Sequence, residues 1–219
     1  MRVLAGADFV AWVAAALVLG FALRSLRWTQ LADAESAAVF VLVLLAMIAL
    51  RLVGLSLGVG EELHFTGAAI ATLMFGWRYA LLASALATAA DAALSGAAWI
   101  GLPWSFLCTG VLPVTATWWL LAATRKVLPR NPFAYFLGAA FGGGLLGAGV
   151  LQVSRAAVLL ALGLGSAESL TTHYLLTLPA MMFGEGFLTG GALAILATWK
   201  PAWVATFDDD FYLRGGPPT

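Results

Sequence analysis

Long apolar blocks, separated by short polar or glycine-bearing links, run along most of the chain. A helix needs roughly 20 apolar residues to cross a bilayer, and most of the blocks approach this length. We therefore expect spanning helices at about residues 8–23, 37–57, 79–94, 105–123, from 133 onward, and at 174–199.

One further block, Phe65–Trp77, is short for a full span and is interrupted by Gly76-Trp77-Arg78. A short helix that dips into the membrane from a re-entrant loop fits this block better than a regular span. The pattern thus predicts an all-α integral membrane protein of about seven transmembrane helices, one of them short. Residues 1–203 form a single transmembrane domain, and residues 204–219 a polar C-terminal tail.

Small residues are dense in the sixth span and recur in the last. Gly138 and Gly142, Gly143 and Gly147, and Gly186 and Gly190 are each four residues apart. This spacing lets helix backbones approach closely, so tight packing is expected. A glycine-lined substrate path is the alternative.

Composition supports the membrane assignment. The chain has 219 residues, of which 62% are hydrophobic and 10% charged, whereas soluble domains are about a quarter charged. Membrane lipid is therefore an expected partner, and the zero net charge gives no reason to expect nucleic acid. The single cysteine, Cys108, excludes an internal disulfide. The first 30 residues lack a basic n-region, so we expect an uncleaved first helix.

Basic residues predict the orientation. Most follow odd-numbered spans: Arg24, Arg27, Arg78, Arg125, Lys126, Arg130 and Lys200. Because cytoplasmic loops are enriched in Lys and Arg, the N-terminus should lie outside and the C-terminal tail in the cytoplasm. The stretch 61–64, the end of the span that carries Asp91, and His173 then share the outer face. Arg51 and Arg155 fall outside this pattern.

The stretch before the short block carries the main candidate chemistry. Glu61, Glu62 and His64 offer carboxylate oxygens and imidazole nitrogen, which suit divalent first-row metals. His173 is a further candidate ligand on the same expected face. The alternatives are an interfacial polar cap around His64 and a solvated helix start at His173.

Three residues inside the spans are candidates for a substrate path or a helix contact. Glu185 and Asp91 are carboxylates at membrane depth, where an ionisable residue suggests a function by default. Glu185 can instead form a hydrogen bond between helices, and Asp91 can pair with Arg51 or Arg155. Cys108 is a soft potential ligand. No nucleophile–base arrangement or nucleotide-binding motif is present, so we expect neither an enzyme nor an organic cofactor.

Two longer motifs resemble a known family. The stretch GxxLHFxGAAxxTLMFGW at 60–77 and the stretch LPxMxxxEGFLTG at 178–190, with a Gly-Leu-Pro loop at 101–103, are similar to the CbiM/NikM family. These proteins are the membrane substrate-capture components of energy-coupling factor (ECF) cobalt and nickel transporters. The resemblance covers about residues 1–203, and the tail at 200–213 resembles a proteobacterial branch of the family.

The resemblance implies a component of an ECF-type ABC uptake system in the cytoplasmic membrane of a bacterium. Its substrate would be a divalent metal ion, cobalt or nickel, and its partners an ECF transmembrane coupling subunit and ATPase subunits. His64 matches a family metal ligand. Arg2 stands where the family has a second histidine, and a guanidinium that stays protonated cannot ligate a cation.

Three functions therefore remain open from the sequence. A rebuilt site would use His64, Glu61, Glu62 and His173 as metal ligands, with binding weakening below about pH 6 as imidazole protonates. The same fold could take a different substrate. Alternatively, the chain is an accessory or assembly protein that docks on a larger membrane complex without transporting anything.

Overall fold

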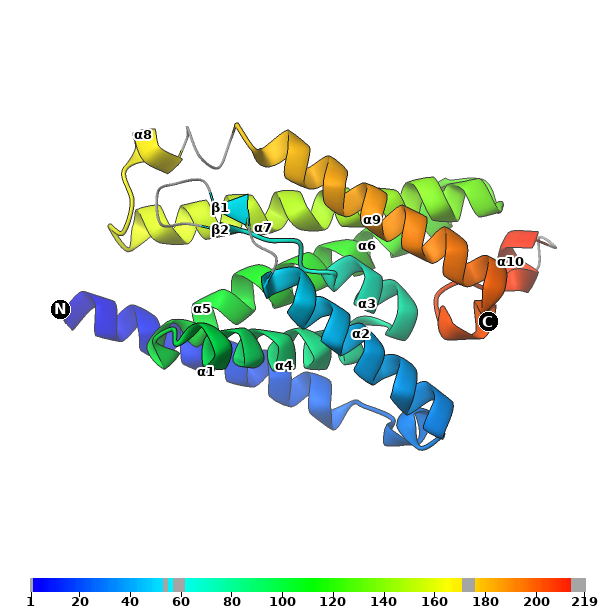
Figure 1. Cartoon of the computed structure of the whole chain (residues 1–219), viewed down its shortest axis with the longest axis horizontal. Helices are drawn as coiled ribbons and strands as arrows, with labels where there is room; N and C mark the ends of the chain where they lie inside the picture. Colours follow the sequence, from blue (N-terminus) through cyan, green and yellow to red (C-terminus); the bar gives the residue numbers. More distant parts are fainter. Residues whose placement is uncertain (1, 53–54, 57–61, 171–175, 214–219) are drawn as a thin grey trace.

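The structure is a computed structural model that describes residues 2–52, 55–56, 62–170 and 176–213. Within these ranges it is a helical bundle with one antiparallel pair of two-residue strands, β1 (Leu55–Ser56) and β2 (Glu62–Leu63). The two ends of the chain lie at opposite ends of the bundle (Figure 1). The all-α architecture expected from the apolar blocks is confirmed.

The long helices of the bundle run roughly along its length. They are α1 (Arg2–Arg24), α2 (Ala34–Leu52), α4 (Trp77–Ser95), α6 (Leu112–Val127), α7 (Gly142–Ala161) and α9 (Leu178–Trp199). Two of them are extended at their N-terminal ends, α6 by α5 (Leu102–Phe106) and the π-helical turns η3 (Leu107–Val111), and α7 by the π-helical turns η4 (Ala134–Phe141). The short elements are η1 (Trp28–Leu31), η2 (Trp99–Gly101), α8 (Ala167–Leu170), η6 (Pro201–Trp203) and α10 (Asp209–Leu213).

Five helical segments of the described chain are long and apolar enough to cross a membrane. They are Gly6–Arg24, Ala34–Leu52, Trp99–Val127, Ala134–Ala161 and Leu178–Trp199. The chain is therefore a multi-pass membrane protein.

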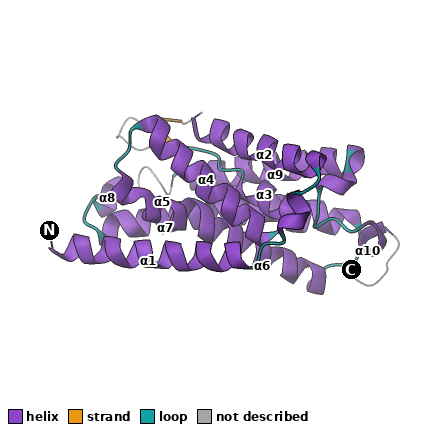
Figure 2. Cartoon of the chain, turned by 90° about the horizontal axis from the view of Figure 1, so that it is seen from below, coloured by secondary structure: helices purple, strands orange, loops and turns teal. Residues whose placement is uncertain are grey.

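Helix α4 has 19 residues but is less apolar than these five segments. Its position explains the difference, because α4 packs against α1, α2, α3 and α6. In the view turned by 90°, α1 lies along one edge of the bundle and α2 and α9 lie toward the other, with α3 and α4 between them (Figure 2). Buried Ala, Ser and Thr side chains on α4 let its neighbours approach closely, and an interior helix has little contact with lipid.

The short apolar block, Phe65–Trp77, contains the eight-residue helix α3 (Ala68–Phe75), so the prediction of a short helix is confirmed. At 1.5 Å per residue, α3 is only about 12 Å long. Two glycines in conformations that other residues rarely adopt mark its ends: Gly67 has a φ of 64° and Gly76 a φ of 83°. The chain thus enters the bundle, forms a half-length helix and turns directly into α4.

Basic side chains gather at one end of the bundle. Arg24 ends α1, Arg78 lies in the first turn of α4, Arg125 and Lys126 lie in the last turn of α6, and Lys200 follows α9. All these helix ends point to the right in Figure 1, whereas β1, β2, α5 and α8 lie toward the left. We call the first the basic end and the second the strand end. The grouping is the one that the order of spans predicted.

The glycine-dense spans pack closely against each other. A Cβ atom on Gly144 of α7 would lie 2.5 Å from the carbonyl oxygen of Glu185 on α9, and one on Gly186 would lie 3.0 Å from the carbonyl oxygen of Phe141. Neither position has room for a side chain. Gly144 and Gly186 therefore serve close helix packing.

Part of the C-terminal segment, expected as a polar tail, packs on the basic end. The backbone N–H of Ala205 donates to the carbonyl of Met74 at 2.9 Å, and the Thr206 hydroxyl donates to the carbonyl of Leu73 at 2.6 Å. Phe211 and Tyr212 are buried. These contacts satisfy carbonyl groups that the end of a short helix leaves without partners.

Candidate functional site

The connection between β2 and α3, residues 64–67, carries the chain from the strand end into the bundle. It is tied to Glu185 of α9, a side chain that is 3% exposed. The backbone N–H of Gly67 donates to Oε1 of Glu185 at 2.8 Å, and the Thr66 hydroxyl donates to the same oxygen at 3.2 Å. The Thr66 N–H lies 3.3 Å from both carboxylate oxygens.

This arrangement gives Glu185 a structural role in the bundle. The first N–H groups of a helix have no partner within it, and the N-terminus of a helix carries partial positive charge. A carboxylate beside the start of α3 meets both requirements, and Glu185 is the acceptor in each of these hydrogen bonds. Phe65 packs beside it, since a Cβ on Gly184 would meet the Phe65 ring at 2.8 Å.

His64 lies just before this anchor and lines a small polar cavity inside the bundle, of about 60 Å³. We call this the His64 cavity. Its lining comes from the connection and from α2, α4, α5, η3 and α7, and consists of Arg51, His64, Thr66, Asp91, Ser105, Thr109, Leu151, Gln152 and Arg155. A second space of about 10 Å³ shares His64, Thr66 and Gln152 and reaches Glu185 and Met181. Spaces of this size take water molecules or a small ion rather than an organic ligand.

Arg51 lines this cavity. The expected order of the spans did not explain its position. Arg51 is 4% exposed and its Nη2 donates to Oγ1 of Thr109 at 3.0 Å. Its Nε atom and the Oε1 atom of Gln152 are buried and have no hydrogen-bond partner among the described residues. Buried polar atoms left in this way are normally satisfied by ordered water or by a ligand.

The charged side chains that line the His64 cavity do not by themselves favour binding of a cation. Arg51 and Arg155 contribute two positive charges, and Asp91 one negative charge. The structure thus brings Asp91 to the same cavity as both arginines. This position is compatible with the predicted pairing of Asp91 with Arg51 or Arg155. A dication placed here would need further carboxylate ligands to offset the two guanidinium groups.

The predicted ligand set is only partly within the described chain. His64 is placed in the cavity wall, whereas Glu61 and His173 lie outside the described residues. The backbone of Glu62 is in β2, but its side chain also lies outside them. Across the described residues, no three His, Cys, Asp or Glu side chains are close enough together to hold a metal ion. The four-residue metal site therefore stays a prediction.

Cys108 lies near this cavity without lining it. It is buried on η3 and lines a separate space of about 180 Å³ that also touches Trp104, Ser105, Thr109 and Arg155.

The indole N–H of Trp104 donates to Oδ1 of Asp8 at 3.0 Å, which joins α5 to α1 at the strand end.

Sequence reasoning missed Gln152, Thr109 and Ser105 as parts of the cavity wall. Gln152 and Arg155 are three residues apart in a mostly apolar helix, so they share one face of α7. A polar pair on one face of a spanning helix is a signal of an interior site. Thr109 and Ser105 gave no comparable signal, because hydroxyl side chains often bond to their own helix, as Thr109 does to the Ser105 carbonyl at 2.8 Å.

The sequence model of the CbiM family, described as the cobalt uptake substrate-specific transmembrane region, matches residues 5–203. No curated protein matches the chain significantly. A solved structure described as a truncated transition metal transporter is similar in fold, with a TM-score of 0.73 and 15% sequence identity, over 87% of this chain and 93% of that one. Because the family match spans nearly all of the helical bundle, this chain belongs to the CbiM family of substrate-specific transmembrane proteins.

Proposed function

We propose that the chain is the substrate-binding membrane component of an ECF-type uptake system, and that its substrate is a divalent transition-metal ion of the cobalt and nickel class. The observation that carries this proposal is the match of the cobalt uptake family over residues 5–203. The position of His64 supports it, because this histidine, which the family resemblance identifies as a ligand, lines an interior cavity and not the lipid-facing surface.

Capture of the ion would depend on a rigid connection between β2 and α3. His64 is two residues before Thr66, whose N–H and hydroxyl bond to the buried Glu185. A metal ligand performs best when neighbouring hydrogen bonds fix its orientation. In this proposal Glu185 positions the connection and does not bind the ion. Glu61, Glu62 and His173 are proposed as the remaining ligands.

The transport direction follows from the basic end. Cytoplasmic ends of spanning helices are enriched in Lys and Arg, so the basic end would face the cytoplasm and the strand end would take the ion from outside. The membrane would be the inner membrane of a bacterium, and the N-terminus of the chain would lie on its outer side. Coupling and ATPase subunits would supply the energy at the basic end, where the chain's own C-terminal segment also packs.

Calorimetric titration of the purified full chain with Co²⁺ and Ni²⁺, with Mg²⁺ as the reference ion, tests this function. We expect binding of the transition metals, and a loss of about 100-fold or more in affinity for His64→Ala, because removal of supporting residues alone costs 10–100-fold at metal sites. Thr198→Ala, an exposed change on α9, is the matched control and should bind as the unchanged protein does.

A second candidate is an accessory or assembly protein on the same fold. The observation that favours it is the pair of arginines, Arg51 and Arg155, in the wall beside His64, together with Arg2 at a family histidine position. If Co²⁺ and Ni²⁺ bind no better than Mg²⁺, and His64→Ala leaves the cellular uptake of both metals unchanged, the transport proposal fails and this candidate replaces it.

A further inference from the structure

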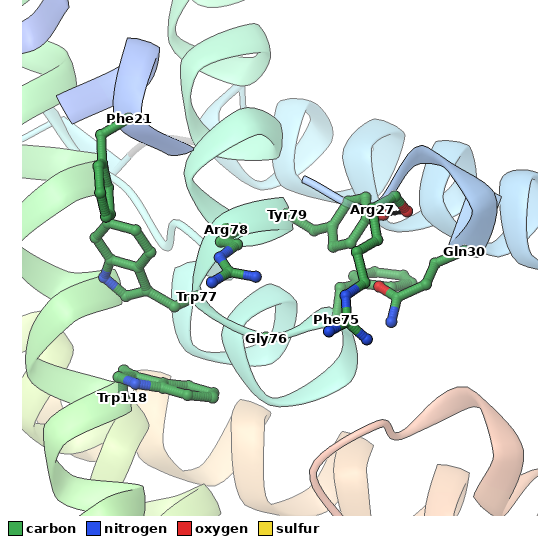
Figure 3. Close-up of a pocket in the computed structure, with 9 residues that line it drawn as sticks. All are labelled: Phe21, Arg27, Gln30, Phe75, Gly76, Trp77, Arg78, Tyr79 and Trp118. Atoms are coloured by element: carbon green, nitrogen blue, oxygen red, sulfur yellow. Dashed lines mark hydrogen bonds between the residues drawn. The ribbon is translucent and has the colours of Figure 1, made fainter. Parts of the chain in front are cut away.

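An open pocket at the basic end is larger than the His64 cavity. Its volume is about 410 Å³, within the range of small-ligand pockets. Figure 3 shows its lining side chains, which come from the end of α1, from η1, from the junction of α3 and α4, and from α6. They are Phe21, Arg27, Gln30, Phe75, Gly76, Trp77, Arg78, Tyr79 and Trp118. We call it the arginine pocket.

Its charge is entirely positive. Arg27 and Arg78 are both exposed, and no Asp or Glu side chain is among the lining residues that the structure describes. Neither guanidinium group has a hydrogen bond or ion pair within the described part of the chain. Gln30 adds an amide, and Figure 3 shows it beside Arg27. Guanidinium groups match phosphate oxygens in both charge and geometry.

The rest of the pocket is aromatic and held in place. The indole N–H of Trp77 donates to Oγ1 of Thr115 at 3.2 Å, and the ring packs edge-on against Phe21 with 6.2 Å between centroids. The Tyr79 hydroxyl donates to the Arg27 carbonyl at 2.5 Å, which fixes the link after α1. Gly76 leaves space in front of Trp118, since a Cβ there would still be 3.9 Å from that ring.

The pocket also adjoins lipid-facing surface. Val13, Leu17 and Phe21 are 42%, 68% and 64% exposed, and their four-residue spacing places them in one stripe along α1 that ends at the pocket. Trp and Tyr side chains, such as Trp77, Tyr79 and Trp118 of the pocket, are enriched at the level of lipid headgroups. A molecule with an anionic head in the pocket and an apolar chain along α1 would match both surfaces.

We propose that the arginine pocket binds the phosphodiester headgroup of an anionic phospholipid, with Arg27 and Arg78 on the phosphate and an acyl chain along Val13, Leu17 and Phe21. Basic pockets between spanning helices recognise such headgroups on the cytoplasmic side of membranes. The proposal is independent of the metal site, because it involves the opposite end of the bundle and none of the His64 cavity residues.

Native mass spectrometry of the detergent-purified full chain tests the proposal. The protein is titrated with phosphatidylglycerol and with phosphatidylcholine of the same acyl chains, which share a phosphate but differ in net charge. We expect preferential binding of phosphatidylglycerol, and a loss of roughly 30-fold for the double variant Arg27→Gln/Arg78→Gln, as two basic residues near a membrane surface would give.

The controls separate charge, folding and the source of the phosphate. Arg24→Gln removes an exposed arginine from the same end of α1 and should weaken lipid binding clearly less than the double variant, because it removes one charge that does not line the pocket. Arg27→Lys/Arg78→Lys should retain most of the binding, and unchanged thermal melting shows that each variant folds. Equal binding of the two lipids, or equal losses in Arg24→Gln and the double variant, overturns the proposal. Displacement of phosphatidylglycerol by millimolar inorganic phosphate would also overturn it, because the site would then be one for soluble phosphate.

Discussion

The two ends of the bundle both carry a pair of arginines next to aromatic or hydroxyl side chains, yet in opposite surroundings. At the strand end, Arg51 is buried, donates to Thr109 and lines a cavity of about 60 Å³. At the basic end, Arg27 and Arg78 are exposed and line an open pocket of about 410 Å³. The same side chain is thus part of a closed interior network at one end and of an accessible binding surface at the other.

The contrast shows what a buried polar network requires in a membrane bundle. A buried guanidinium or carboxylate needs partners from several segments, because water is scarce there. Glu185 obtains its partners from a connection that lies 118–119 residues earlier in the chain. The exposed arginines need no such partners, since water and lipid headgroups are available to them. Changes that leave buried polar groups without partners at the closed end should therefore lower stability more than changes at the open end.

The largest effect is expected from Glu185→Ala. This change leaves the buried N–H groups of Thr66 and Gly67 and the Thr66 hydroxyl without their acceptor. An unsatisfied buried donor costs about 1–3 kcal/mol, so a loss of roughly 3 kcal/mol or more should lower the melting temperature by about 6–12 °C. Thermal unfolding in detergent measures it. Glu185→Gln keeps an acceptor oxygen and should lose clearly less; equal losses would contradict the anchoring role.

Gly67→Ala should come next in size. Gly67 has a positive φ, and an added Cβ would lie 3.3 Å from Cγ of Met47 and 3.4 Å from Cδ1 of Leu50. The backbone penalty alone is about 1–2 kcal/mol. The same thermal measurement should show a smaller loss than Glu185→Ala. Gly96→Ala is the control that has positive φ but no atom within 4 Å of the added Cβ, so the difference between the two variants isolates the crowding.

Arg51→Gln should raise the affinity for a divalent metal ion at the His64 cavity. Removing one buried positive charge from the wall relieves repulsion of the cation, and about tenfold is expected at the effective dielectric of protein interiors. Titration calorimetry with Co²⁺ provides the measurement. Thr109→Val, which keeps the charge and removes only its hydrogen-bond partner, should leave the affinity within about threefold by the same reasoning. Unchanged or lower affinity in Arg51→Gln would contradict the predicted repulsion between this arginine and the cation.

The smallest effect is expected from Lys200→Gln at the basic end. Lys200 lies 3.8 Å from Oε1 of Glu35, with both side chains more than half exposed, and 5.6 Å from the ring centroid of Trp203. Exposed pairs of this kind contribute about 1 kcal/mol or less. The melting temperature should therefore fall by less than about 4 °C. A drop as large as that of Glu185→Ala would remove the contrast between the two ends.

Much of the fold was predictable because hydrocarbon imposes strict local requirements. The long apolar blocks predicted the five segments that are long and apolar enough to span a membrane. The short block between Phe65 and Trp77 predicted the half-length helix α3. The density of glycine in α7 and α9 predicted the close packing that Gly144 and Gly186 make. The site was less predictable: His64 and Glu185 stood out by residue type, but nothing local distinguished the cavity wall from ordinary helix contacts.

The sequence by itself therefore determined most of the segments that are long and apolar enough to cross a membrane, the block that is too short to do so, and which end is basic. These properties depend on residues close together in the chain, and hydrophobicity and charge act on them directly. Only the tertiary structure decided that Glu185 holds the start of α3, that Arg51 and Thr109 meet across 58 positions, and that Arg27 and Arg78 share a pocket. Such pairings are set by how the helices pack, since a buried polar group accepts whichever partner the neighbouring backbone brings within reach.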